Sequence, residues 1–181
     1  MICAFQRGIA VKDQYDEPNF TDVIPGRIED DKNRVEAEIR ALCFEQPFAV
    51  LATQGEGQPY TNLISFAISK ELGHLVFSTP AQSRKFDLIS KNKKASLLID
   101  NRSRQPKSIN LISAVTITGT ARALEDAQES ERWSGLLIKR HNYLEKFIKS
   151  PSSTLILVDI FRFFYVRRFQ EVYQWSPETR S

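Results

Sequence analysis

The sequence predicts a mainly β protein of α+β character: an antiparallel β-barrel of six or seven strands with three or four short helices around it. An early run of β-rich segments is separated by turns too short for parallel crossovers, which excludes a doubly wound sheet. Helical periodicity occurs only in short stretches between strands, and the chain has no internal repeat. The 181 residues suffice for one domain, which we place at residues 31–181, after an extended N-terminal arm at residues 1–30.

The first predicted element of the domain is a helix that begins after Asp31 and ends before Pro47. Aspartate is a common N-cap, and proline does not continue a helix. Apolar residues recur between them at the spacing of one helical face: Val35, Ile39, Leu42 and Cys43. We therefore expect the helix to lie on the sheet through this stripe.

Three strands follow the helix. The run FAVLATQ is rich in β-forming residues, GEG is a turn, and QPYTNLISFAIS is a second strand that forms a hairpin with the first. A turn at KELG leads to a third strand, HLVFST. In the second strand, alternation places Tyr60, Asn62, Ile64 and Phe66 on one face. Both faces are partly apolar, which fits the wall of a barrel.

The second half of the chain alternates between short helices and strands. SRKFDLISKN predicts a helix, ASLLID a strand, and VTITGTARAL a strand in which Gly119 indicates a bulge or a close approach. Residues 126–149 predict two short helices with these buried positions: Trp133, Leu136, Leu137, Leu144, Phe147 and Ile148. TLILVDI and FRFFYVRRFQEVYQW complete the barrel as two or three strands.

Composition excludes several classes of protein. With 41% hydrophobic and 26% charged residues, the chain is neither disordered nor collagenous. Two cysteines and two histidines, Cys3, Cys43, His74 and His141, predict neither a disulfide framework nor a metal site. Charged residues interrupt every long apolar run, so we expect a cytoplasmic protein with no membrane segment.

Positive charge is concentrated in one segment. The whole chain has a net charge of +3, whereas residues 82–107 hold eight basic and two acidic residues, which gives +6. We expect an anionic ligand near this segment. Nucleic acid is not the expected partner, because the segment has no interleaved aromatic platform and no nucleic-acid motif.

The segment from Ser78 to Lys85 ends a strand and begins a helix, and its residues suit a phosphate. A helix N-terminus offers N–H groups and a favourable dipole. Hydroxyl groups are added by Ser78, Thr79 and Ser83, and full positive charges by Arg84 and Lys85. The alternative is that Ser83 only caps the helix and the basic residues are solvated. The neighbouring strand favours the interpretation as a phosphate site. The mixed polar and apolar face of residues 62–65 suits a flat heteroaromatic ring, which would lie beside the phosphate.

The runs AVLATQGEGQPYTNLISFAI, HLVFST, SRKFDLISKNKKASLLID and VTITGTARAL resemble the FMN-binding split barrel of pyridoxamine 5'-phosphate oxidase-like proteins. The resemblance implies a homodimer with flavin at the subunit interface and an oxidoreductase activity on a small molecule. It implies phosphate contacts from Ser78, Thr79, Ser83, Arg84 and Lys85. It implies that the isoalloxazine ring is flanked by Asn62, Leu63, Ile64 and Ser65. No catalytic residue is assigned.

The chain departs from the true oxidases of that family. They have an arginine at the position of Asn62 and a C-terminal pattern of arginines and tryptophan, of which only Trp175 and Arg180 are present here. The family's glutamine before the strand VTITGTARAL is replaced, since Ser113 and Ala114 stand there. We therefore do not expect pyridoxamine phosphate to be the substrate.

Two alternatives stay open. Relatives on the same barrel bind or degrade haem, which would require an axial ligand, His74 or His141, although each is more simply a surface or capping residue. The other alternative is a carrier or sensor that binds flavin or the deazaflavin F420 without turnover. Cys43 is expected to be a core residue rather than a nucleophile, because it lies on the apolar stripe of its helix.

Overall fold

The computed structural model describes residues 32–105, 108, 111–168 and 171–177, so the predicted arm at residues 1–30 and the predicted N-cap Asp31 lie outside the described residues. The strands are β1 (Phe48–Gly55), β2 (Gln58–Ile68), β3 (His74–Pro80), β4 (Lys94–Asp100), β5 (Ser113–Ala123), β6 (Ser153–Arg167) and β7 (Glu171–Trp175). The α-helices are α1 (Lys32–Glu45), α2 (Arg84–Lys91), α3 (Ala127–Arg140) and α4 (Glu145–Ile148). Short 3-10 turns lie at Arg102–Arg104 and Asn142–Leu144.

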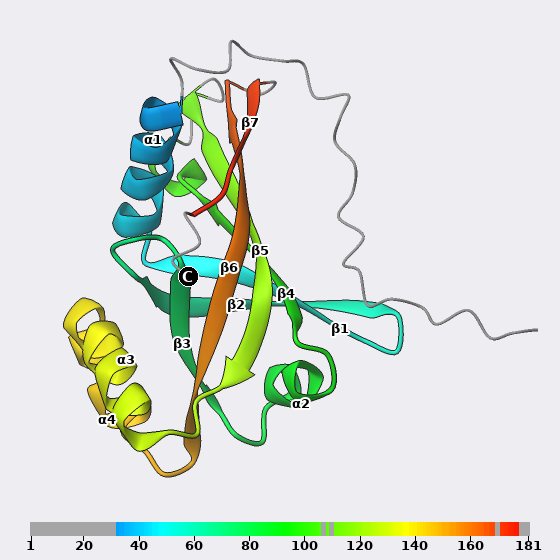
Figure 1. Cartoon of the computed structure of the whole chain (residues 1–181), viewed down its shortest axis with the longest axis vertical. Coiled ribbons are helices and arrows are strands. Elements are labelled where there is room, and N and C mark those ends of the chain that lie inside the picture. Colours follow the sequence, from blue (N-terminus) through cyan, green and yellow to red (C-terminus); the bar gives the residue numbers. More distant parts are fainter. Residues whose placement is uncertain (1–31, 106–107, 109–110, 169–170, 178–181) are drawn as a thin grey trace, which may run out of the picture.

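Six strands close into an antiparallel barrel (Figure 1). They follow the order β3-β2-β1-β4-β5-β6, and β3 pairs with β6 from His74–Asp159 to Pro80–Ser153, which closes the ring. β7 pairs with the second half of β6 and extends the sheet beyond the ring. The predicted fold class, a mainly β antiparallel barrel of six or seven strands with short peripheral helices, is confirmed.

The barrel interior is apolar because side chains alternate along each strand. Leu51, Leu97 and Ile117 fill inward positions of β1, β4 and β5, and each is at most 1% exposed. Phe66 and Phe163 add aromatic rings that are fully buried. Burial of each such side chain stabilises the fold by about 1.5–3 kcal/mol.

The β1–β2 hairpin turns at Glu56 and Gly57, whose φ angles are 53° and 80°. Positive φ at both central residues is the geometry of a type I′ turn, whose twist matches that of the flanking strands. The register runs unbroken from Gly55–Gln58 to Phe48–Ser65. The predicted hairpin and the position of its turn are confirmed.

Gly119 marks an irregularity in β5, as the sequence predicts. The register of β5 against β6 shifts between Thr118 and Gly119. A Cβ atom on Gly119 would lie 2.2 Å from the carbonyl oxygen of Asp159. Only a residue without a side chain fits between the two backbones here.

Helices cover the barrel on two sides. α1 packs on the core through the stripe predicted from the sequence, whose four members are at most 5% exposed: Val35, Ile39, Leu42 and Cys43. α3 and α4 lie together beside the barrel (Figure 1), and Trp133 and Leu137 pack on outward residues of β2, β3 and β6. The predicted burial is only partial at Leu136 and Leu144. It is wrong at Phe147, which is 38% exposed because Ile148 takes the buried position in the single turn of α4.

Arg140 joins α3 to the end of α1. Its Nη2 atom donates to the carbonyl oxygens of Cys43 at 2.8 Å and Phe44 at 3.2 Å, and to that of Gln46. A helix leaves its last carbonyl groups without intrahelical partners, so one guanidinium caps the C-terminus of α1. The guanidinium also lies 4.7 Å from the ring centre of Phe66, which holds the helix pair against β2.

Candidate functional site

The barrel is split between β2 and β3. β2 pairs with β1 from Gln58 to Ser65, but its pairing with β3 covers only Phe66–Ile68. β3 continues along β6 as far as Pro80. The two strands therefore separate beyond Phe77, and residues 58–65 of β2 border an opening that we call the split.

Backbone polar groups point into the split from both strands. The N–H of Ser69 donates to the carbonyl oxygen of His74 at 2.8 Å, so these two residues face each other across β2 and β3. Backbone groups alternate in direction along a strand. The same direction is therefore shared by every second residue of β2: Thr61, Leu63 and Ser65. By the same alternation, Ser78 of β3 points back toward them.

The four β2 residues predicted to flank a flavin ring take different roles. Leu63 is 68% exposed on the outside of the barrel, and Ser65 lies half-buried on the same side. Asn62 points inward, and its Oδ1 is buried with no hydrogen-bond partner in the described part of the chain. Ile64 is 6% exposed and belongs to the core, so it supports the split rather than lining it.

The segment from Ser78 to Lys85 has the predicted strand-to-helix geometry. Ser83 is the N-cap of α2, and its Oγ accepts from the N–H of Phe86 at 3.3 Å. Thr79 is 1% exposed, and its Oγ1 lies 2.8 Å from Ser83 Oγ. The side chain of Ser78 lies on the opposite face of β3, where its Oγ is buried without a partner among the described residues. The structure thus brings together Thr79 and Ser83, whereas Ser78 reaches the split through its backbone.

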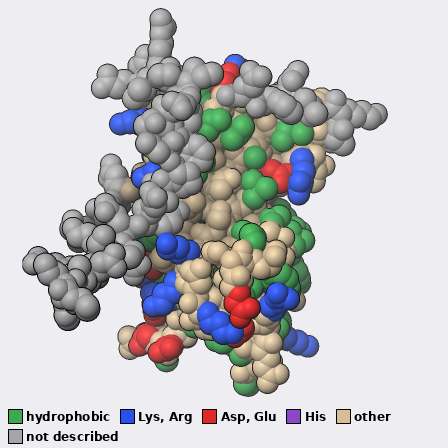
Figure 2. All heavy atoms as spheres, turned by 90° about the vertical axis from the view of Figure 1, so that its right-hand side faces the viewer, with side chains coloured by type: hydrophobic (Ala, Val, Ile, Leu, Met, Phe, Trp, Pro, Cys, Tyr) green, Lys and Arg blue, Asp and Glu red, His purple; other side chains and the backbone are tan. Residues whose placement is uncertain are grey.

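Arg84 and Lys85 begin α2 at the border of the split. The guanidinium carbon of Arg84 lies 4.8 Å from the ring centre of Tyr60 on β2, a cation–π contact that orients the charge. Asp87 in the first turn pairs with Lys91 at 2.9 Å and so does not neutralise Arg84. Figure 2 looks onto the side of the molecule that carries α2 and shows basic side chains on the lower half of that face.

Sequence reasoning missed the role of Tyr60. Alternation predicts that Tyr60 shares a face with Asn62, but the contact with Arg84 joins two elements that are distant in the sequence. Only the pairing of β2 with its neighbours brings α2 beside this strand. The one signal in the sequence is that Tyr60 is an aromatic residue on the strand predicted to flank the ligand.

The two histidines differ in what they can bind. His141 is 2% exposed, with Nε2 2.8 Å from the carbonyl oxygen of Phe66 and Nδ1 3.2 Å from the hydroxyl of Tyr143. Burial lowers its pKa, so the ring is neutral at pH 7. Of the two simpler predictions for His141, a surface or a capping residue, the structure agrees with the second, because His141 is the buried C-cap of α3. The side chain of His74, by contrast, is 40% exposed.

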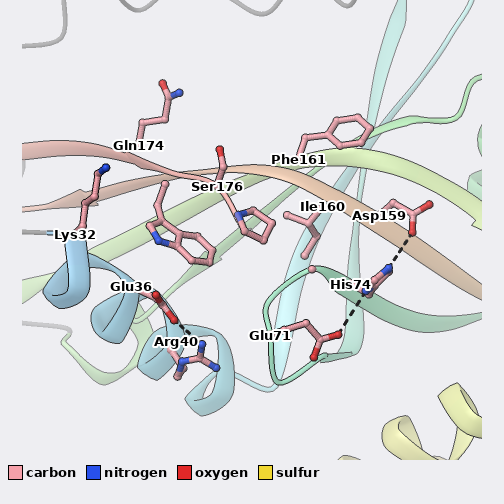
Figure 3. Close-up of a pocket in the computed structure, with 13 residues that line it drawn as sticks. Lys32, Glu36, Arg40, Glu71, His74, Asp159, Ile160, Phe161, Gln174 and Ser176 are labelled. Atoms are coloured by element: carbon pink, nitrogen blue, oxygen red, sulfur yellow. Dashed lines mark hydrogen bonds and ion pairs between the residues drawn. The ribbon is translucent and has the colours of Figure 1, made fainter. Parts of the chain in front are cut away.

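A separate pocket of about 1200 Å³ lies between α1, the beginning of β3 and the β6–β7 pair (Figure 3). His74 is on its wall, with Nε2 3.5 Å from Asp159 Oδ1 and Nδ1 3.7 Å from Glu71 Oε1. Lys32 and Arg40 of α1 line it as well. None of the predicted flavin-binding residues is part of this lining. Sequence reasoning did not find the pocket, because its residues come from distant parts of the chain.

Two further properties concern the described residues alone. No group of three or more His, Cys, Asp or Glu side chains among them is arranged to hold a metal ion. None of the helices in this part of the chain is both long and apolar enough to cross a membrane.

The closed antiparallel ring and its split, with a basic helix N-terminus at the border, define a split-barrel protein. The family model described as pyridoxamine 5'-phosphate oxidase matches residues 35–167, and the chain belongs to this family. The predicted family is therefore confirmed. No curated protein matches the sequence of the chain.

Several solved structures have the same fold. A haem-binding protein from Mycobacterium smegmatis matches with a TM-score of 0.69 and 16% identity, over 78% of this chain and 57% of that one. Campylobacter jejuni ChuZ matches with a TM-score of 0.69 and 16% identity, over 80% and 60%. A protein from Clostridium acetobutylicum, related to general stress protein 26 of Bacillus subtilis, matches with a TM-score of 0.60 and 20% identity, over 81% and 96%. At these identities the likeness shows the fold, and the chain spans 57% of the length of the first neighbour.

Proposed function

We propose that the protein binds FMN at the split and is a flavin-dependent oxidoreductase that acts on a small molecule. One observation carries the proposal: the basic N-terminus of α2 lies beside a strand edge whose backbone groups are not paired with β3. The first feature suits a phosphate and the second suits the polar edge of a flat ring. Family membership supports the same combination.

The residues at the split fit both parts of FMN. The first amides of a helix have no intrahelical partner, so those of Arg84 and Lys85 are positioned to donate to phosphate oxygens. Their side chains add two positive charges, and the acid of the same turn is engaged by Lys91. Leu63, 68% exposed, offers an apolar surface beside the β2 edge on which a ring can lie. The buried Oδ1 of Asn62 is an acceptor without a partner in the described chain.

In this proposal the protein binds and orients, and the cofactor carries the redox chemistry. Bound FMN would supply hydride transfer to or from its ring system. N–H groups of Leu63 and Ser65 at the β2 edge would stabilise negative charge at the edge of the flavin ring. By holding the phosphate, Arg84 and Lys85 would fix the distance of the ring from the strand. No described residue is assigned as a catalytic acid or base. The departures at Asn62 and at the C-terminus favour a substrate other than pyridoxamine phosphate.

We also propose a homodimer that covers the outer face beside the split. Phe48 is 44% exposed and Leu63 is 68% exposed, and the pairing of Phe48 with Ser65 places them close together on adjacent strands. Large apolar side chains exposed side by side are typical of an interaction surface. A second subunit at this face would shield the exposed side of the ring from water.

The test compares FMN with riboflavin, which lacks the phosphate. Replacing both Arg84 and Lys85 by Ala should weaken FMN by roughly tenfold to a hundredfold, because charge-assisted hydrogen bonds are lost at a partly exposed site. Riboflavin affinity should change less than about threefold, since neutral riboflavin loses no charge-assisted bond. Lys93→Ala with Lys146→Ala, two exposed lysines away from the N-terminus of α2, removes the same charge and is the matched control. Equal loss of both ligands in the Arg84/Lys85 variant would contradict the assignment.

Haem and deazaflavin F420 are the alternatives that one spectrum separates. A two-banded flavin spectrum of the purified protein, retained through gel filtration, supports FMN. A Soret band after addition of haemin would instead require a ligand such as His74, because both ring nitrogens of His141 have hydrogen-bond partners. Binding of F420 or FMN without reduction by NADH or NADPH would indicate a carrier or sensor.

A further inference from the structure

The pocket between α1, β3 and β7 has a recognition chemistry that the proposed flavin site does not use. We propose that it is a second ligand site, for a small organic cation: an ammonium or guanidinium group attached to an apolar or aromatic body. The cation would lie beside His74, near the carboxylates of Glu71 and Asp159 that flank it, and the body would lie against Ile160, Phe161 and Trp175.

The acidic end of the pocket is accessible and negatively charged. The side chains of Glu71, His74 and Asp159 are 46%, 40% and 39% exposed, so a ligand can reach both carboxylates. The Nδ1 atom of His74 is itself buried, without a hydrogen-bond partner among the described residues. In Figure 3 the two carboxylates flank the imidazole of His74, and dashed lines join each of them to the ring. Burial acts to raise the pKa of Glu71, but hydrogen bonds from its own backbone and from Ser69, together with His74, outweigh burial and lower it. Glu71 is therefore a carboxylate at neutral pH.

Asp159 keeps its charge available toward the pocket. Its nearest arginine is Arg122, with Nε 3.8 Å from Asp159 Oδ2. That guanidinium is held by the carboxylate of Glu129, at 2.6 and 3.1 Å. Arg122 therefore neutralises Glu129 first, and the negative field of Asp159 remains to attract a cation.

On the α1 side of the pocket, Arg40 is already paired and is not available to bind an anionic ligand. Arg40 forms an ion pair with Glu36 at 2.7 Å, and its Nη1 donates to the carbonyl oxygen of Lys70. Figure 3 shows Arg40 turned toward Glu36 on the same helix. With this pair compensated, the pocket has Glu71 and Asp159 on one side against Lys32 at the far rim. The charge balance favours a cationic ligand over an anionic one.

Aromatic and aliphatic side chains form the wall between the two ends. Phe161 is 44% exposed, although it is one of the largest apolar side chains of β6. Trp175 lines the pocket while its ring also packs on Phe163, with ring centres 5.3 Å apart. Carboxylates combined with aromatic faces are a common arrangement for binding organic ammonium groups.

The site is independent of the proposed flavin site. Its residues are not among those assigned to FMN, and His74 and Ser78 are separated by about 13 Å along β3 at the rise of a β-strand. A failure of the FMN proposal therefore leaves this one standing, and the reverse also holds. FMN affinity measured on the same variants keeps the two results distinguishable.

The experiment uses the full chain and two probes of matched shape and opposite charge, 2-phenylethylamine and 3-phenylpropanoate. Binding is measured by isothermal titration and by saturation-transfer NMR. We expect the amine to bind and the carboxylate to bind at least about fivefold more weakly, consistent with the strength of partly exposed ion pairs. Glu71→Gln and Asp159→Asn, which keep the shape of each side chain, should each weaken the amine by about threefold or more. Glu131→Gln, an exposed acid on α3 outside the pocket, is the matched control and should have no effect.

Three outcomes would overturn the proposal. Equal binding of the two probes would show that the pocket recognises only the apolar body. Absence of amine binding to the full chain would show that the pocket is not a site for this class of ligand, including the case in which another segment of the chain occupies it. Amine binding that persists unchanged in both Glu71→Gln and Asp159→Asn would place the probe elsewhere. If one variant fails to fold, the probe comparison and the other variant still decide.

Discussion

Replacing Gly119 by Ala should strongly destabilise the barrel, although the change adds a single methyl group. The added Cβ would lie 2.2 Å from the carbonyl oxygen of Asp159 and 3.1 Å from Cγ1 of Val158. Ordinary contact requires more than 3 Å, so β5 and β6 would have to move apart by nearly 1 Å at this point. Both strands are fixed in the ring on either side, so neither can move alone.

The magnitude follows from two costs. Overpacking a close-packed site costs about 1–3 kcal/mol, and each weakened ladder hydrogen bond adds about 1 kcal/mol. We expect a loss of about 3 kcal/mol in the free energy of unfolding. For a domain of this size that corresponds to a fall in Tm of about 6–12 °C.

Two other glycines provide matched controls for the same substitution. Gly135, inside α3, has no atom within 4 Å of an added Cβ, so Gly135→Ala should stabilise the protein by about 0.5–1 kcal/mol through helix propensity. Gly57 also has open space but a φ of +80°, so Gly57→Ala should cost about 1 kcal/mol through backbone strain alone. Urea unfolding of the three variants, with midpoint and slope both fitted, gives the comparison. If Gly119→Ala is as stable as the wild type, the close approach of β5 to β6 is not a constraint and the reasoning is refuted.

Three further predictions concern groups around α1 and α3. Burial raises the pKa of Cys43 to about 12. In a Cys3→Ser variant, the Cys43 thiol of the native protein should therefore not react with a thiol reagent at pH 8, and it should react fully after unfolding. Rapid reaction in the native state would contradict its burial. Burial lowers the pKa of His141 below its ordinary value of 6.5. The neutral ring's contribution to the free energy of unfolding is therefore complete above pH 6.5 and is lost as the pH falls through the lowered pKa. If the unfolding free energies of the wild type and His141→Gln stay parallel from pH 8 to 5, this prediction is wrong. Arg140→Met should lower the free energy of unfolding by about 2 kcal/mol, because the carbonyl groups at the end of α1 lose their donor. Lys139→Met, at an exposed position beside it, should change this free energy little. Similar losses for the two variants would mean that the cap does not stabilise the fold.

The parts of the fold that the sequence predicts well are those set by local patterns. The stripe from Val35 to Cys43 and the turn at Glu56 and Gly57 each depend on residues close together in the chain. A glycine within a β-branched run is enough to indicate the irregularity at Gly119, although its partner Asp159 lies on another strand. Phe147 shows the limit of this reasoning. In a helix of one turn, periodicity does not determine which of two adjacent apolar residues is buried. The packing of Ile148 in one cluster with Leu155 and Leu157 of β6 decides it.

The candidate site divides in the same way. The strand-to-helix segment from Ser78 to Lys85 is contiguous, so its geometry could be predicted from residue types. The face to which Ser78 points depends on the phase of β3. The width of the split depends on where β2 leaves β3, and no turn or proline marks that point within β2. The cation pocket combines residues from both ends of the described chain, and only the folded barrel brings them together.

Closure of the ring through β3 and β6 has a consequence for how the protein is made. The paired residues are 159 − 74 = 85 positions apart at one end of this ladder and 153 − 80 = 73 at the other. Contacts between such distant segments form late and slowly during folding. Until they form, the apolar segments 75–77 and 155–158 present open strand edges that can associate with other chains. We therefore expect slow synthesis at low temperature to raise the yield of native protein in cells. Under these conditions the barrel has time to close before unfolded chains associate.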